Sequence, residues 1–201
     1  VIFAINDRVG IPRQINYEKQ DIFKGQIING YGKDVNNIDF KNKSVVIVGM
    51  GAFATENMRT VLEAGAKQVT ILCRRKGTVC PKYIEYINFI NKSSGGDDLL
   101  HNSVENTHNM VTWRKLYEKS GAKQPECWPG NIKHYGHTIS VSDIFFIGYY
   151  LGLIEIVTDE IKEFYEDGVT TFNNDNIDAD IIIKCTGFES NASLIPRLTS
   201  Y

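Results

Sequence analysis

The clearest elements of this chain are runs of consecutive apolar residues without polar alternation. Ser44–Val48 is β-branched after its first residue, which is typical of a parallel strand buried on both faces. Phe53–Ala66 follows a glycine break and carries apolar residues at near-helical spacing, and Gln68–Cys73 is a second apolar run. These segments predict a strand, a helix and a strand in one βαβ unit, whose crossover should be right-handed.

Helical segments with a weaker pattern follow the second strand. Pro81–Asn91 is expected to form a helix begun by its proline, and another is expected near Met110–Lys119. A third is expected over Asp143–Leu151, capped by Ser140 or Ser142. The residues of this third helix that are expected to be deeply buried are Ile144, Phe145, Phe146 and Ile147.

Short β segments dominate the remainder of the chain. One is expected around Gln26–Ile28, within the otherwise irregular residues 6–42. The turn Glu166-Asp167-Gly168 predicts a hairpin. The later strands are expected at Leu153–Val157, Ile161–Tyr165, Val169–Phe172 and Asp180–Lys184. The order of elements predicts an α/β fold: a Rossmann-like parallel sheet with flanking helices and a small antiparallel β-meander near the C-terminus.

Charge and composition remove several function classes. Lys and Arg number 22 against 24 Asp and Glu, so a net charge of -2 offers no basic field for nucleic acid or an anionic membrane. No apolar run approaches the ~20 residues of a membrane-spanning helix, and no signal peptide is evident. We therefore expect neither a nucleic-acid partner nor a membrane span. A cytoplasmic location is expected.

Cysteines and histidines lack the spacing of a metal site. The cysteines form no CxxC pair, so buried reduced thiols are expected. His134 and His137 are close in sequence, but no third ligand accompanies them, and no metal is predicted. The cysteines are Cys73, Cys80, Cys127 and Cys185.

The glycine break between the first strand and its helix has the pattern G-x-G-x-x-A. Gly49 permits a tight turn out of the strand, and Gly51 lets a pyrophosphate approach where a Cβ would intervene. Ala54 lets the helix pack closely on the strand, and the helix N-terminus offers N–H groups to phosphates. The motif predicts a dinucleotide site, against the alternative of a glycine turn without a ligand. Its residues are Gly49, Met50, Gly51, Ala52, Phe53 and Ala54.

The residues after the second strand indicate which dinucleotide is expected. NAD sites usually have Asp or Glu here to bind the ribose 2′-hydroxyl, whereas this chain has Arg74, Arg75 and Lys76. A guanidinium binds phosphate through two hydrogen bonds and stacks on adenine. Arg74 and Arg75 are therefore predicted to bind a 2′-phosphate, with Lys76 as an ancillary charge. This favours NADP(H) over NAD, the alternative being a solvated basic turn.

A second motif lies upstream of the glycine loop. The stretch FKGQIINGYGK resembles the fingerprint F-x-G-x-x-x-H-x-x-x-(Y/F/K/T) of the flavin-containing monooxygenases and their class B relatives. Phe23, Gly25 and Lys33 match it, and Asn29 stands where the family has His. The related Baeyer–Villiger enzymes have Trp at the last position, so Lys33 favours the flavin-containing monooxygenases.

Segments near both ends of the chain carry the same resemblance. Val1–Pro12 is similar to a family segment in which a strand ending in Ala-Thr-Gly leads to a proline. Asp180–Phe188 resembles the second such strand, and residues 161–168 resemble part of the closing meander. The resemblance implies that Thr186 and Gly187 belong to the cofactor site.

The resemblance also implies how the chain is divided. Residues 1–40 are expected to be a strand and linker to a missing FAD-binding domain, and 190–201 a return segment. Residues 41–189 are expected to form an NADP(H)-binding Rossmann-like domain with a helical insertion at about 93–138. For a complete enzyme of this type, the resemblance implies that NADPH transfers hydride to FAD, that the reduced flavin reacts with O2, and that a small-molecule substrate is oxygenated. By itself the chain is expected to bind NADP(H) and to be inactive.

Two other interpretations use the same glycine loop. Pyridine-nucleotide disulfide reductases have a second nucleotide domain in which a Glu follows the glycine turn on the helix, as Glu56 does here. Glu56 either orients the glycine turn at the cofactor site or lies on the solvent face of the helix. A nonenzymatic NADP-binding module would use the loop without a flavin domain. The order of the motifs favours the monooxygenase-like interpretation.

Overall fold

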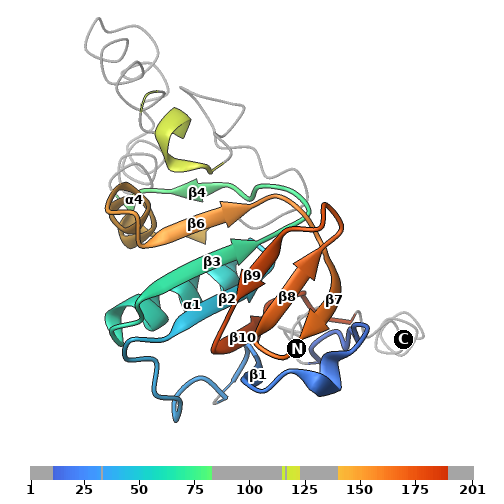
Figure 1. The fold of residues 1–201 in the computed structure, drawn as a ribbon. Coiled ribbons are helices and arrows are strands. Elements are labelled where there is room, and N and C mark those ends of the chain that lie inside the picture. The colour runs from blue at the N-terminus through green and yellow to red at the C-terminus, as the bar shows by residue number, and fades with distance from the viewer. Residues whose placement is uncertain (1–10, 33, 83–114, 116, 123–139, 190–201) are drawn as a thin grey trace, which may run out of the picture.

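A parallel sheet forms the centre of the protein in this computed structural model (Figure 1). The structure describes residues 11–32, 34–82, 115, 117–122 and 140–189. Within these ranges the sheet has five strands in the order β1-β10-β2-β3-β6, and every neighbouring pair is parallel. The strands are β1 (Gln26–Asn29), β2 (Ser44–Val48), β3 (Gln68–Leu72), β6 (Ile154–Val157) and β10 (Ile181–Lys184).

Two helices cover one face of the sheet. Helix α1 (Ala52–Glu63) packs on β2 and β3, and α4 (Asp143–Tyr150) packs on β6 and on α1. Alternate residues of a strand point to opposite faces, so Val45 and Ile47 of β2 face the helices. Met58 of α1 is fully buried in the same cluster.

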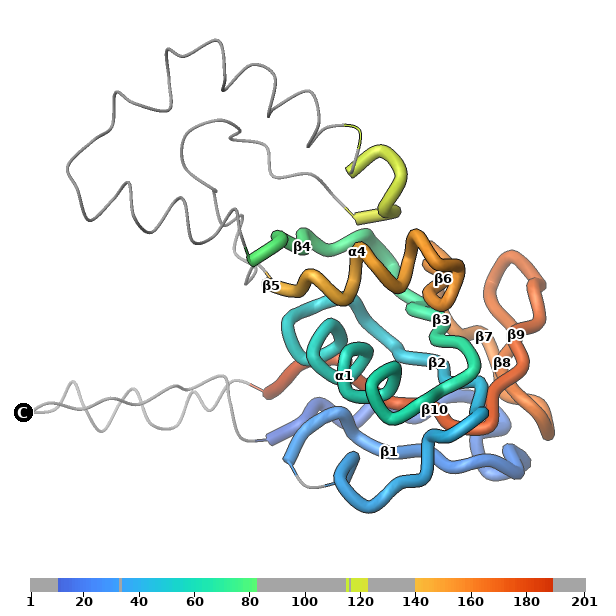
Figure 2. Tube along the Cα trace, turned by 90° about the vertical axis from the view of Figure 1, so that its left-hand side faces the viewer, coloured from blue at the N-terminus to red at the C-terminus, as the bar shows by residue number. Residues whose placement is uncertain are grey.

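An antiparallel meander covers the other face. It consists of β7 (Ile161–Tyr165), β8 (Gly168–Thr171) and β9 (Asn176–Asp178). Figure 2 shows α1 on one side of the sheet and the meander on the other. The central residue of this second core is Phe164, which is 1% exposed and packs in one cluster with Val46 and Ile182.

The segment before β1 is attached to the meander. It contains a short 3-10 helix, Gln20–Ile22, and the N–H of Phe164 donates to the carbonyl of Glu18 at 2.9 Å. The ring of Tyr17 lies 5.8 Å from that of Phe164. Part of the irregular N-terminal region is thus folded against the sheet.

Most of the predicted elements are present, and the α/β fold class is confirmed. Strand β2 has the predicted bounds, and helix α1 ends before Gly65, whose φ of +85° is left-handed. Ser142 is the residue that caps α4, because its side chain accepts the N–H of Phe145 at 3.3 Å. Among the strands in the described ranges, three were not predicted: β4 (Val79–Cys80), β5 (Ser140–Val141) and β9.

The expected burial of Ile147 is wrong. This side chain is 53% exposed, whereas Phe145 and Phe146 are buried, because only one side of α4 faces the core. Several expectations lie outside the described residues: most of Pro81–Asn91 and Met110–Lys119, the insertion from about 93 to 138, the histidines and Cys127. Residue 115 and residues 117–120 are helical. No helix in the described ranges is long and apolar enough to cross a membrane.

The second core predicts a contrast between two phenylalanines of the meander. Replacing Phe164 with Ala should lower the free energy of unfolding by about 3–5 kcal/mol, because a buried ring is lost and a cavity is left. Phe172 is 62% exposed, so Phe172→Ala is the control and should stay within about 0.5 kcal/mol. Urea unfolding measures both, and equal losses would contradict the assignment of Phe164 to the core.

Candidate functional site

The carboxyl edge of the sheet contains a change in strand order. From β2 the chain passes to β3 on one side and returns later to β10 on the other. Ligands of open α/β sheets bind outside the carboxyl ends of the strands at such a switch point. The glycine loop after β2 and residues 185–187 after β10 both lie there.

Gly49 makes the close contact between these two loops. Its φ is +109°, and a Cβ at this position would lie 2.5 Å from the carbonyl oxygen of Cys185. The N–H of Gly49 donates to the carbonyl of Leu72 at 2.8 Å. Only glycine fits this position, because both the backbone angle and the approach of Cys185 exclude a side chain.

Gly51 occupies a different environment. It is the N-cap residue of α1 with a φ of -102°, and a Cβ built on it would meet no atom within 4 Å. No side chain caps this end of α1, and the first backbone bond across it joins the N–H of Thr55 to the carbonyl of Gly51. Gly51 and Phe53 are exposed, and Ala52 and the preceding Met50 are half-buried, so this end of the helix is open to a ligand.

The basic turn after β3 lies against the glycine loop. A Cβ at Gly77 would lie 2.0 Å from the carbonyl oxygen of Met50, so the two loops are in backbone contact. Arg74, Arg75 and Lys76 are all exposed. Arg74 Nε lies 3.7 Å from Glu160 Oε1. The structure thus brings the predicted phosphate-binding turn next to the predicted pyrophosphate loop.

Asn57 joins the helix to two further strands. Its side chain is buried, and Nδ2 donates to the carbonyl of Gly30 after β1 at 2.9 Å. The same nitrogen lies 3.7 Å from Sγ of Cys185 after β10 and 2.7 Å from the carbonyl of Phe53. Removing this amide would leave a buried carbonyl without its partner, which costs about 1–3 kcal/mol.

The residues after β10 are engaged with the N-terminal segment. Arg13 donates its N–H to Gly187 at 2.9 Å and accepts the hydroxyl of Thr186 at 3.2 Å. Burial raises the pKa of the Cys185 thiol to about 12, so the thiol is neutral at physiological pH. Thr186 and Gly187 follow β10 and so lie at the switch point, and the Thr186 hydroxyl donates to the carbonyl of Arg13.

Three aromatic rings gather beside the glycine loop. Phe53 and Phe188 are edge to face with centroids 5.0 Å apart, and Tyr31 contacts both. Phe53 remains 39% exposed. These rings come from α1 and from the segments after β1 and β10, so the same edge of the sheet has an apolar border.

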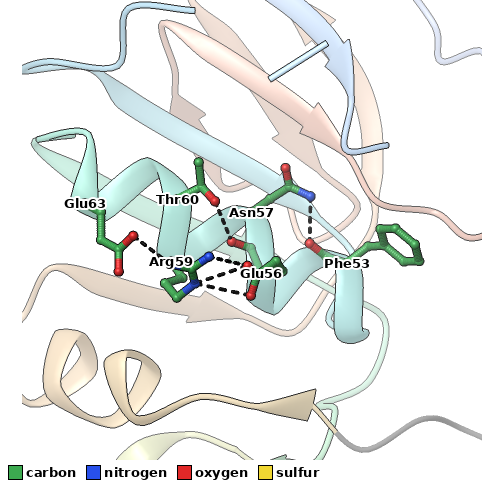
Figure 3. Close-up of polar contacts among 6 residues, drawn as sticks. All are labelled: Phe53, Glu56, Asn57, Arg59, Thr60 and Glu63. Atoms are coloured by element: carbon green, nitrogen blue, oxygen red, sulfur yellow. Dashed lines mark hydrogen bonds and ion pairs between the residues drawn. The ribbon is translucent and has the colours of Figure 1, made fainter. Parts of the chain in front are cut away.

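Glu56 pairs with a neighbouring cation on the exposed surface of α1. Figure 3 shows its carboxylate beside Arg59, which also reaches Glu63 at 2.7 Å. The hydrogen bond from Arg59 lowers the pKa of Glu56. The carboxylate of Glu56 is therefore engaged along the helix, and no described contact joins it to the glycine turn.

The fingerprint residues have two locations. Phe23 and Gly25 precede β1 and lie at the opposite, amino edge of the sheet, where Phe23 packs edge to face on Phe164. A Cβ at Gly25 would lie 2.3 Å from the carbonyl of Asp180. Asn29 ends β1 opposite Lys184, and residue 33 is outside the described ranges. Phe23 and Gly25 thus contribute packing rather than contacts to the glycine loop.

Sequence reasoning missed Asn57 and Glu160. A signal for Asn57 was available, since it lies three residues after Ala54 and one before Met58 and so falls on the buried face of the helix. A polar residue on a buried face needs a partner. No comparable signal existed for Glu160, because its partner Arg74 is distant in sequence.

Comparisons with known proteins agree with this geometry. A family model described as "Putative NAD(P)-binding" matches residues 37–114, which include β2, α1 and β3. The "Probable FAD-binding monooxygenase AlmA" of Acinetobacter baylyi is 27% identical over 204 residues, covering 87% of this chain and 39% of that protein. The chain thus spans about two fifths of this relative's length.

Solved structures share the fold. A steroid monooxygenase bound to NADP has a TM-score of 0.59 at 15% identity, covering 94% of this chain and 47% of its own. OTEMO in complex with FAD and NADP has a TM-score of 0.61 at 16% identity, with coverages of 94% and 48%. Part of the chain thus matches an NAD(P)-binding family model, and the chain resembles an FAD-binding monooxygenase in sequence and NADP-bound monooxygenases in fold, so the expected resemblance is confirmed.

The two glycines of the loop should respond differently to the same substitution. Gly49→Ala should lower the free energy of unfolding by about 1–3 kcal/mol or more, because the backbone angle and the Cys185 carbonyl both oppose a Cβ. Gly51→Ala is the matched control and should cost less, about 0.5–1 kcal/mol, because the added Cβ meets no atom and only a less favoured N-cap residue is introduced. Thermal or urea unfolding measures the difference, and equal effects would show that Gly49 is not under this constraint.

Proposed function

We propose that this chain binds NADP(H) across the carboxyl edge of its sheet. The observation that carries the proposal is the open backbone at Gly51, which begins α1 directly beside the basic turn. The pyrophosphate would lie against the first turn of α1, where N–H groups and the helix dipole favour an anion. The other residues of the motif would shape the loop and carry no charged groups; they are Gly49, Ala52, Phe53 and Ala54.

The adenosine end of the nucleotide would lie over the loop after β3. Contact between Gly77 and Met50 keeps this loop beside the pyrophosphate position. Arg74 and Arg75 would bind the 2′-phosphate, and Lys76 would add to the local positive charge. Thr186 and Gly187, at the end of β10, would border the other half of the nucleotide.

We further propose that this domain presents NADPH to an FAD held by another domain of a larger protein. FAD would supply the redox chemistry by accepting the hydride, and the domain described here would supply the orientation of NADPH. The OTEMO structure supports this division of roles between two domains, because it contains both FAD and NADP and the present chain covers only 48% of its length. Residues 1–40 and 190–201 would form the connections, and the eventual substrate would be a small molecule.

Gly51→Asp tests the binding proposal. A carboxylate at this position would occupy and repel the place of the pyrophosphate, so NADP+ affinity should fall at least about tenfold. Aspartate is a favoured N-cap residue, and unfolding should therefore confirm an intact fold. Calorimetric titration measures the affinity, with Gly51→Asn as the uncharged control of similar size, which should lose less. An unchanged affinity in Gly51→Asp would contradict the proposal.

Replacing both Arg74 and Arg75 with Ala tests the choice of nucleotide. NADP+ carries the additional 2′-phosphate, so the double variant should weaken NADP+ by about tenfold or more and NAD+ by less than about threefold. The control replaces Lys41 and Lys67 with Ala: both are exposed and precede the amino ends of β2 and β3, so the same charge is removed at the opposite edge of the sheet and the ratio of the affinities should be unchanged. Equal losses for both nucleotides would overturn the preference for NADP(H).

A further inference from the structure

An acidic turn leaves the sheet beside the basic turn. Strands β3 and β6 are parallel neighbours with Leu72 opposite Val157, and the N–H of Cys73 donates to the carbonyl of Val157 at 3.0 Å. The residues that follow the two strands therefore emerge side by side at the carboxyl edge. One of these segments contains Arg74, and the other contains Asp159 and Glu160.

The backbone of the acidic turn does not depend on the side chain of Glu160. Asp159 Oδ1 accepts the N–H of Glu160 at 2.8 Å, and its Oδ2 accepts the N–H of Asn173 at 2.9 Å. The hydrogen bond from Asn173 is the main cause of a lowered pKa of Asp159. The carbonyl of Glu160 in turn accepts the N–H of Phe172 at 3.2 Å. Asp159 is therefore committed to the fold, and the Glu160 carboxylate is available for another role.

Within the described residues, the ion pair recorded for Glu160 is with Arg74, at 3.7 Å. Both side chains are more exposed than buried, at 56% and 72%. Burial raises the pKa of the Tyr17 phenol in the N-terminal segment, the charge of Glu160 raises it further, and that of Arg74 lowers it. Glu160 thus lies beside the guanidinium to which the proposed function assigns the 2′-phosphate.

We propose that Glu160 determines how strongly the site prefers NADP(H) over NAD(H), by holding Arg74 when no nucleotide is bound. The inference rests on the proposed function. A guanidinium that binds the 2′-phosphate through two hydrogen bonds must either turn away from the carboxylate or share its positive charge with it, and both weaken its interaction with the phosphate. A ribose with a free 2′-hydroxyl makes neither demand. Glu160 therefore opposes NADP(H) selectively and limits the preference that the basic turn provides.

The test is a double-mutant cycle on the full chain. NADP+ and NAD+ are titrated by calorimetry, at low salt, into the unsubstituted chain, Glu160→Gln, Arg74→Ala and the double variant. Glu160→Gln should tighten NADP+ by about two- to tenfold, a range set by the modest strength of exposed ion pairs. NAD+ should change by less than about twofold. In the Arg74→Ala background, Glu160→Gln should change the ratio of NADP+ to NAD+ affinity by less than about twofold.

Glu155→Gln is the charge-matched control, because Glu155 is an exposed carboxylate of β6 opposite Thr70, well before the carboxyl edge. It should leave both affinities unchanged. An unchanged ratio of NADP+ to NAD+ affinity in Glu160→Gln would overturn the inference alone, and so would an effect that persists without Arg74. If the unsubstituted chain binds neither nucleotide, the proposed function fails and this inference with it.

Discussion

The contact between the backbone of Gly49 and the carbonyl of Cys185 determines the arrangement of the candidate site. Strands β2 and β10 stay hydrogen-bonded to their ends, since the N–H of Cys185 donates to Val48 at 2.9 Å. The loops that follow these two strands therefore diverge only beyond Gly49 and Cys185, where no side chain fits between them. Helix α1 consequently begins close to the sheet. Asn57 can reach Gly30 and Cys185 only because the helix lies this close.

The meander has two consequences for the carboxyl edge. It buries the second face of the sheet around Phe164, and through that core it fixes the N-terminal segment that carries Tyr17. Lys184, at the end of β10, adds to this attachment by donating to the carbonyl of Ile15 at 2.9 Å and to Gln20 at 2.6 Å. Glu160 directly precedes the first strand of the meander, which places its carboxylate beside Arg74. A packing element thus contributes to the electrostatics of the site.

Sequence patterns predicted the features that depend on residues close together in the chain. The apolar run of β2 and the glycine break after it identify a strand, a turn and a helix, because burial on two faces and left-handed backbone leave signs in the sequence. Ile147 was misjudged because an apolar run on a short helix does not show which side the core covers. The role of Phe23 depends on a meander more than a hundred residues later in the sequence. The pairing of Arg74 with Glu160 follows from the register of β3 and β6, which no local pattern specifies.

The antiparallel bonds between Ile11–Arg13 and Gly187–Glu189 mean that the polypeptide enters and leaves this unit along neighbouring paths. Arg13 donates to Gly187 and Glu189 donates to Ile11, both at 2.9 Å, so the two paths are about 5 Å apart. The two ends of the described unit are therefore held at one place on its surface, a geometry in which a folded unit needs only one pair of adjacent connections to anything joined to it.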